Sequence, residues 1–280
     1  MDYKTINLVV TDIDSDGPAL AAASALAIRY RAHLDVQCIG IDPIRYDAMP
    51  MGGMMIVPDS VGIDVQKRAD ALLAWVKATI PAELDTVAMQ AVVIQQMEFD
   101  REVARTARYA DLVIASKAYG PQHSPVQVAV LESVLFNTGA PVLVVPDEKI
   151  DFSKPLGRLV VAWNETREAL SAIRRALPLL IAASHVDIVV IDPAPHSPER
   201  SDPGGSVALM LTRHGVRAEV TILARSLPRV SDILARFATE HAVDAIVMGA
   251  YGHSRFREAI LGGATRDMLE TAKLPLIMAH

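Results

Sequence analysis

Residues 243–265 read Val243-Asp-Ala-Ile-Val-Met-Gly249-Ala-Tyr-Gly252-His-Ser-Arg-Phe-Arg-Glu-Ala-Ile-Leu-Gly262-Gly263-Ala-Thr265. A strand of buried type comes first, spaced glycines follow, and a helix is expected to begin at Gly262 or Gly263. Glycine lets backbone N–H groups approach an anion without an intervening Cβ, and a helix N-terminus adds the positive end of its dipole. The stretch therefore has the layout of a phosphate-binding loop in a strand–helix protein.

Simpler interpretations of the same glycines exist. Gly249 and Gly252 could form only the turn after a strand, and Gly262-Gly263 could be only a loop between two elements. The order of strand, loop and helix is the order that a nucleotide site requires, and this favours the binding interpretation.

Composition places the chain among globular proteins that bind small molecules. The 280 residues are 51% apolar and 21% charged, which is enough for an extensive core and suggests about two domains. The net charge is −6 and no Lys or Arg stripe is present, so nucleic-acid binding is not expected. The apolar run at the start is too short for a signal peptide or a membrane span. Cys38 is the only cysteine, which excludes an intrachain disulfide and favours the cytoplasm.

The two halves of the chain repeat the same succession of segments. In the first half, a strand over 6–12 leads through an Ala-rich helix around 18–32 to a strand over 34–42. In the second half, a strand over 159–164 leads through a helix around 166–183 to a strand over 186–192. Later landmarks lie closer together in the second half, so the first half carries extra residues, expected in a Met-rich loop at 49–58 and in a longer second helix.

The strands are too uniformly apolar for a sheet with one face in water, which indicates parallel sheets covered on both faces. We therefore expect an α/β protein of two tandem Rossmann-like domains, residues 1–147 and 156–280, each an open five-stranded parallel sheet. The last strands, 141–146 and 275–280, would lie at sheet edges that invite pairing. Their pairing would dock the two domains as a pseudo-dimer within one chain, and a remaining apolar face favours a homodimer.

Gly249, Gly252 and Gly262 fit the Gly-x2-Gly-x9-Gly pattern of the universal stress protein family position for position. With the repeat, the whole chain resembles two such domains in tandem. The family pattern continues with Ser or Thr, whereas here Gly263 occupies that position and Thr265 is the nearest hydroxyl. The resemblance implies a cytoplasmic stress-response regulatory protein that binds ATP or AMP, with or without Mg²⁺, in its C-terminal domain.

The resemblance also implies which residues bind the nucleotide. The family's acidic residue after the first strand falls at Asn164, its Gly-Ser pair at Glu165-Thr166, and its adenine-contacting backbone near Ile191. A helix cap is an equal alternative for Asn164 and Thr166, and Trp163 is expected to pack in the core rather than on a base. The complete set of expected binding residues is Ala162, Trp163, Asn164, Thr166, Ile191, Gly249, Gly252, His253, Gly262, Gly263, Ala264 and Thr265.

The first half lacks the matching loop, because Ser116 stands opposite Gly249 and no glycine occurs between Pro121 and Thr138. We expect side chains to crowd any phosphate there, which makes the first domain a degenerate copy. Asp12 is then expected to serve as a strand-end cap or an interdomain contact.

Signals for catalysis are weak. No Gly-x4-Gly-Lys-Ser/Thr string occurs, and no His-x3-His pair would place two metal ligands on one helix face. His253 is a lone loop histidine, a kind that is usually solvated, so no catalytic or metal-binding residue is assigned. Two alternative functions remain: a nucleotide-independent interaction or scaffold protein, and a weak ATP-hydrolysing or autophosphorylating enzyme.

Overall fold

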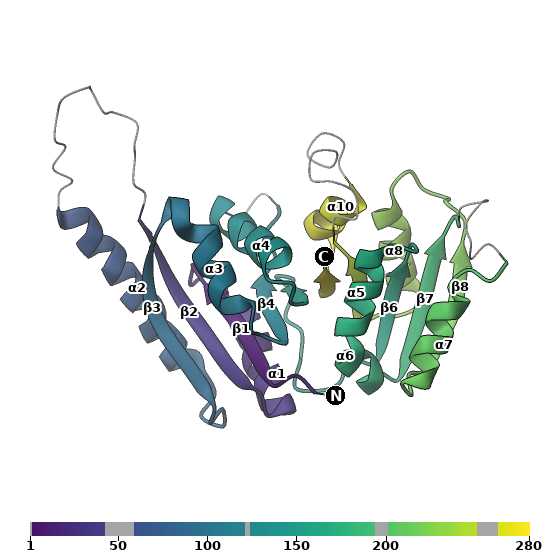
Figure 1. Cartoon of the computed structure of the whole chain (residues 1–280), viewed down its shortest axis with the longest axis horizontal. Coiled ribbons are helices and arrows are strands. Elements are labelled where there is room, and N and C mark those ends of the chain that lie inside the picture. Colours follow the sequence, from purple (N-terminus) through teal and green to yellow (C-terminus); the bar gives the residue numbers. More distant parts are fainter. Residues whose placement is uncertain (1, 43–58, 121–123, 194–200, 251–262) are drawn as a thin grey trace, which may run out of the picture.

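The computed structural model describes residues 2–42, 59–120, 124–193, 201–250 and 263–280. Their ten strands form one continuous sheet that carries helices on both faces (Figure 1). No helix among the described residues is long and apolar enough to cross a membrane.

The N-terminal half alternates strands and helices. Its elements are β1 (Thr5–Val10), α1 (Gly17–Tyr30), β2 (His33–Asp42), α2 (Asp59–Thr79), β3 (Val87–Gln95), the 3-10 turn η1 (Gln96–Glu98), α3 (Phe99–Ala107), β4 (Leu112–Ser116), α4 (Pro125–Asn137) and β5 (Val142–Val145).

The C-terminal half repeats this order. Its elements are β6 (Arg158–Trp163), α5 (Arg167–Arg175), α6 (Leu177–Ala182), β7 (His185–Ile191), α7 (Gly205–Arg213), β8 (Ala218–Leu223), α8 (Val230–Glu240), β9 (Ala245–Gly249), α10 (Ala264–Thr271) and β10 (Leu276–Ala279).

The single helix expected over 166–183 is wrong in detail, because α5 and α6 are separate helices. Pro178 lies in the first turn of α6, where its missing N–H costs nothing; within one continuous helix it would remove a hydrogen bond and clash with the preceding turn. The longer second helix of the first half is confirmed, since α2 has 21 residues and α7 has 9. The Met-rich loop at 49–58 lies outside the described residues.

The strand order is β3-β2-β1-β4-β5-β10-β9-β6-β7-β8. Each half contributes five strands, and all neighbours within a half that have a recorded register run parallel, as expected. In both halves the first strand lies between the second and the fourth, so the chain reverses its direction across the sheet beside β1 and beside β6. This reversal is the topological switch point of an open α/β sheet.

The two halves join through their last strands, as the sequence predicts. β10 pairs antiparallel with β5, with Leu276 opposite Val144 and Met278 opposite Val142. Further contacts reinforce the junction: the Tyr3 hydroxyl donates to the Arg175 carbonyl oxygen at 3.0 Å. Pairing both edges in one chain removes two exposed strands that could recruit another molecule.

Two apolar layers fill the space between sheet and helices. On one face, α1, α2, α5, α6 and α7 cover a cluster that includes Leu20, Val76 and Ile173. On the other face, α3, α4, α8 and α10 cover a cluster that includes Val103, Leu131 and Phe237. Each sheet face is therefore buried, which explains why the strands are apolar at successive positions.

Candidate functional site

The carboxyl ends of β9, β6 and β7 lie next to one another at the switch point of the C-terminal half. Ala162 pairs with Met248 and Trp163 pairs with Val190, so Asn164 follows level with Ala250 and Ile191. This edge carries most of the predicted binding residues that the structure describes. Open α/β sheets bind ligands in the crevice at such an edge.

The turn from β6 into α5 is built by Asn164, Glu165 and Thr166. Thr166 is the N-cap of α5: its Oγ1 accepts from the Ala169 N–H at 3.2 Å and donates to Asn164 Oδ1 at 2.8 Å. The cap interpretation is thus confirmed for Thr166, while Asn164 supports the cap and is exposed at the edge. Glu165 has φ 62°, a left-handed conformation that glycine adopts without strain. Its position is the one where the family pattern has glycine.

Gly249, the last residue of β9, lies against the first turn of α5. A Cβ at this position would come within 2.6 Å of the Ala169 nitrogen and 2.8 Å of the Glu168 carbonyl carbon. Close approach of strand and helix therefore accounts for this glycine without any ligand. Its role in binding remains a prediction.

The start of α10 faces the same loop. Gly263 is the N-cap and brings no side chain to the free N–H groups of the first turn, so that the helix begins where the sequence predicts. Ala264 is exposed and Thr265 is buried at 6% exposure. Gly252, His253 and Gly262 lie outside the described residues.

The remaining predicted residues follow β6 and β7. Trp163 is buried in the core, as predicted, and Ala162 and Ile191 are half-buried. After Ile191, Asp192 takes a left-handed conformation with φ 50° and its N–H donates to the Leu223 carbonyl. This turn ends β7 at the ligand edge.

The equivalent edge of the N-terminal half has a cavity of about 620 Å³ lined by Asp12, Asp14, Arg68, Ser124 and others. Strand register places Thr11, not Asp12, level with Asn164, because Thr5 and Arg158 occupy equivalent positions opposite His33 and His185. Asp12 caps the loop that follows β1: its Oδ1 accepts from the Asp14 and Ser15 N–H groups and from the Ser15 hydroxyl.

A buried carboxylate closes this N-terminal edge. Asp16 is 2% exposed, and its oxygens accept from the Thr11 N–H at 2.7 Å, the Asp12 N–H at 3.0 Å and the Ser116 hydroxyl at 2.6 Å. Burial raises the pKa of Asp16, and these hydrogen bonds oppose the rise. Ser116 therefore binds an internal carboxylate at the place where the other half has Gly249.

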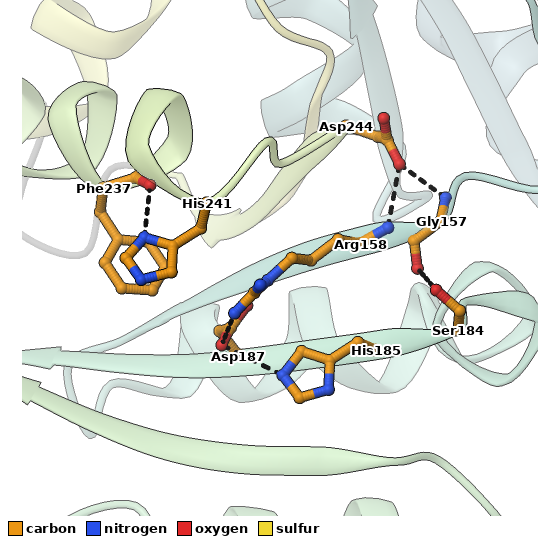
Figure 2. A network of polar contacts seen from close by, with 8 residues as sticks. All are labelled: Gly157, Arg158, Ser184, His185, Asp187, Phe237, His241 and Asp244. Atoms are coloured by element: carbon orange, nitrogen blue, oxygen red, sulfur yellow. Dashed lines mark hydrogen bonds and ion pairs between the residues drawn. The ribbon is translucent and has the colours of Figure 1, made fainter.

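A polar network lies at the opposite, amino-terminal ends of β6 and β7 (Figure 2). The Arg158 guanidinium donates to both carboxylate oxygens of Asp187, at 2.6 and 2.8 Å, and His185 Nε2 lies 3.2 Å from the same carboxylate. Burial alone would raise the pKa of Asp187, but Arg158, with help from His185, lowers it. Asp244 Oδ2 accepts the Gly157 and Arg158 N–H groups.

Sequence reasoning missed this network, although the repeat carried its signal. A His-x-Asp unit starts both β2, as His33 and Asp35, and β7, as His185 and Asp187. Asp111 accepts the Lys4 and Thr5 N–H groups just as Asp244 does in the other half. Two copies of the same tie at equivalent places indicate a structural role, away from the ligand edge.

The described residues suit a ligand with an anionic part at α10. An uncapped helix N-terminus and an exposed amide at Asn164 favour a phosphate and a hydrogen-bonding group. No group of three His, Cys, Asp or Glu side chains that could hold a metal ion occurs among the described residues. A protein-only metal centre therefore has no support in this part of the chain.

Comparisons with known proteins agree with this architecture. The model of the Universal stress protein family matches residues 155–280. A 98-residue stretch is 26% identical to Universal stress protein Slr1230 of Synechocystis sp.; it covers 35% of this chain and 33% of that relative, so the match spans a third of the relative's length.

Solved structures match over almost the whole chain. A universal stress protein from Archaeoglobus fulgidus DSM 4304 aligns with a TM-score of 0.73 and 14% identity, covering 98% of this chain and 95% of that one. A functionally unknown protein from Pseudomonas aeruginosa PAO1 aligns with a TM-score of 0.58 and 14% identity, covering 99% and 92%. At these identities the likeness concerns the fold.

Proposed function

The chain is a universal stress protein, with the family's domain in residues 155–280, and from this premise we propose that it binds ATP or AMP in that half. Occupancy of the site would make it a cytoplasmic stress-response regulator that responds to adenine nucleotides. The predicted contacts are those at the ends of β6, β7 and β9 and at the start of α10.

One observation carries the proposal. The exposed Asn164, the end of β7 at Ile191, the end of β9 at Gly249 and the uncapped α10 N-terminus converge on one edge at the switch point. The helix end offers N–H donors and a positive dipole to phosphate, and the strand ends offer hydrogen-bonding groups to adenosine. The glycine pattern connects β9 to α10 between these groups.

The N-terminal half supports a stoichiometry of one nucleotide per chain. Its edge cavity is lined by Asp12 and Asp14, and buried Asp16 already takes the backbone N–H groups that an anion would use. Carboxylates repel phosphate at short range. We therefore assign nucleotide binding to the C-terminal half alone.

Calorimetric titration of the intact chain with ATP and with AMP, each with and without Mg²⁺, tests the proposal. We expect one site per chain. The double variant Gly252→Val, Gly262→Val should lose binding and still unfold cooperatively, because added Cβ groups would occupy phosphate space. Asp12→Asn serves as the control and should leave both affinity and stoichiometry unchanged. Two sites per chain, or unchanged affinity in the double variant, would refute the assignment.

A nucleotide-independent interaction protein is the second candidate, and the packing of Gly249 favours it. Because α5 itself requires a glycine at this position, the glycine pattern could persist without a ligand. Mass spectrometry of small molecules released from freshly purified, denatured protein separates the two candidates. Co-purified adenine nucleotide supports the first, and its absence together with a flat titration supports the second.

A further inference from the structure

A second cavity, distant from the nucleotide edge, opens between α3 and the sheet of the N-terminal half. It measures about 410 Å³, a size suited to a small molecule. Its lining includes Asn7 on β1, Asp35 and Gln37 on β2, and Thr106 and Tyr109 on and after α3. We call it the α3 cavity.

The floor of the α3 cavity holds a buried polar atom with no partner. Asn7 is 2% exposed, and its Oδ1 accepts no hydrogen bond from any described residue. A buried acceptor without a donor costs free energy, so such a group in a native protein indicates a ligand or an ordered water.

Gln37 adds the complementary group. It is 5% exposed, and its Oε1 accepts from the Thr106 hydroxyl at 2.7 Å. The amide nitrogen of Gln37 has no acceptor among the described residues and keeps its two donors. The floor thus offers a free acceptor at Asn7 and free donors at Gln37, the pattern that a hydroxyl group satisfies in both directions.

The C-terminal half shows that the fold does not need these polar side chains. Strand register makes Val160 the equivalent of Asn7 and Val189 the equivalent of Gln37. Both valines are 1% exposed and pack in the apolar cluster under α8. Polar groups therefore replace an apolar layer only where the cavity lies.

The charges at the cavity are already paired. Arg105 Nε donates to Glu102 at 2.8 Å, and Asp35 Oδ1 lies 3.2 Å from His33 Nε2. Neither an anion nor a cation finds an uncompensated charge among these residues, which favours a neutral ligand. Tyr109 is 78% exposed and adds an aromatic ring, a surface on which the C–H face of a sugar packs.

We propose that the α3 cavity binds a small neutral polyhydroxylated molecule, a monosaccharide or a cyclic polyol. Its hydroxyls would donate to Asn7 Oδ1 and accept from the Gln37 amide, and its ring would pack on Tyr109. The site is separate from the nucleotide edge, so the two proposals stand or fall independently.

Saturation-transfer NMR and calorimetry of the intact chain with D-glucose and with myo-inositol test the proposal. We expect saturable binding of at least one probe, with a dissociation constant on the order of millimolar. Asn7→Val, which installs the residue found at position 160, should fold and should weaken binding about tenfold through the lost hydrogen bond. Tyr109→Ala, at an exposed position, should weaken it as well, whereas Leu209→Ala, an exposed apolar residue on α7, should leave it unchanged.

Three results would overturn the proposal. They are no saturable binding of either probe, binding that survives Asn7→Val at full affinity, or a probe-soaked crystal that shows only water at Asn7. If Asn7→Val fails to fold, Tyr109→Ala decides, and unchanged affinity in that variant rejects the site. AMP titration in parallel reports on the nucleotide proposal alone.

Discussion

The two halves share one frame but place their buried carboxylates at opposite ends of the strands. In the N-terminal half Asp16 lies at the carboxyl edge and binds the N–H groups of Thr11 and Asp12. In the C-terminal half Asp187 lies at the amino edge, where Arg158 compensates it. One half therefore fills its ligand edge with its own anion, and the other leaves that edge available. A repeated fold can keep its strand order while the location of one carboxylate decides whether an anion can bind.

What the halves retain is structural. Asp111 and Asp244 each tie the first strand to the fourth by accepting two backbone N–H groups. Both hold the start of a central strand in register, which either half needs whatever it binds. The differences gather at the strand ends and in the layer under α3.

The largest difference is expected between two aspartates at equivalent positions. The Asp187 side chain is 3% exposed and bonded to Arg158, so Asp187→Ala should cost about 3 kcal/mol, because a guanidinium is left without its partner. The equivalent Asp35 is 42% exposed, and Asp35→Ala should cost less than about 0.5 kcal/mol. Urea unfolding of both variants measures this, and equal losses would contradict the asymmetry.

The next effect comes from exchanging the residues that end β9 and β4. Gly249→Ser should cost about 2 kcal/mol, since its Cβ meets the backbone of α5. Ser116→Gly should cost about 1 kcal/mol, since Asp16 loses a hydrogen bond. Thermal melts rank the two variants. A harmless Gly249→Ser would show that α5 can move and would return this glycine to a purely ligand-binding role.

A smaller effect separates the halves by pH. The pKa of Asp16 is raised above the ordinary 3.8 by burial, so its stabilising contribution is present below the unfolded pKa and is lost as pH rises through the folded pKa. The pKa of Asp187 is lowered, so its contribution is present above the unfolded pKa and is lost as pH falls through the folded pKa.

Unfolding free energies measured between about pH 3 and pH 6 check these signs. Relative to the unsubstituted chain, Asp187→Asn should reduce the loss of stability toward acid, and Asp16→Asn should increase it. Slopes that change in the same direction in both variants would show that one of the two signs is wrong.

The smallest effect concerns the turn before α5. Glu165 has φ 62°, and Glu165→Gly should be more stable than Glu165→Ala by about 1 kcal/mol, because only glycine adopts this conformation without strain. Both variants remove the same side chain, so their difference isolates the backbone. Equal melting temperatures would show that the turn relaxes to another conformation.

Much of the fold could be predicted from local patterns. Apolar runs over residues 6–12 and 159–164 predicted parallel strands, because both faces of such strands are buried. The repeat predicted five strands in each half and the pairing of the last strands, which β5 and β10 confirm. The break between α5 and α6 was missed because Pro178 was not weighed against the periodicity of the helix.

The candidate site was predictable in its location and less so in its contacts. Asn164, Ile191 and Gly249 could be placed at one edge from the strand ends alone. That Thr166 caps α5 and that Gly249 packs on it depend on how closely the helix approaches the sheet, a distance that no sequence spacing contains.

By itself the sequence determined the alternation of strands and helices, the duplication and the edge at which a ligand would bind, because these follow from periodicity and from the order of elements. Only the tertiary structure decided where each polar side chain finds its partner. Asp16 meets Ser116 across 100 residues, and Asn7 finds no partner at all. Such outcomes depend on the register between strands distant in sequence and on the depth of burial, because burial sets the cost of an unpaired polar group.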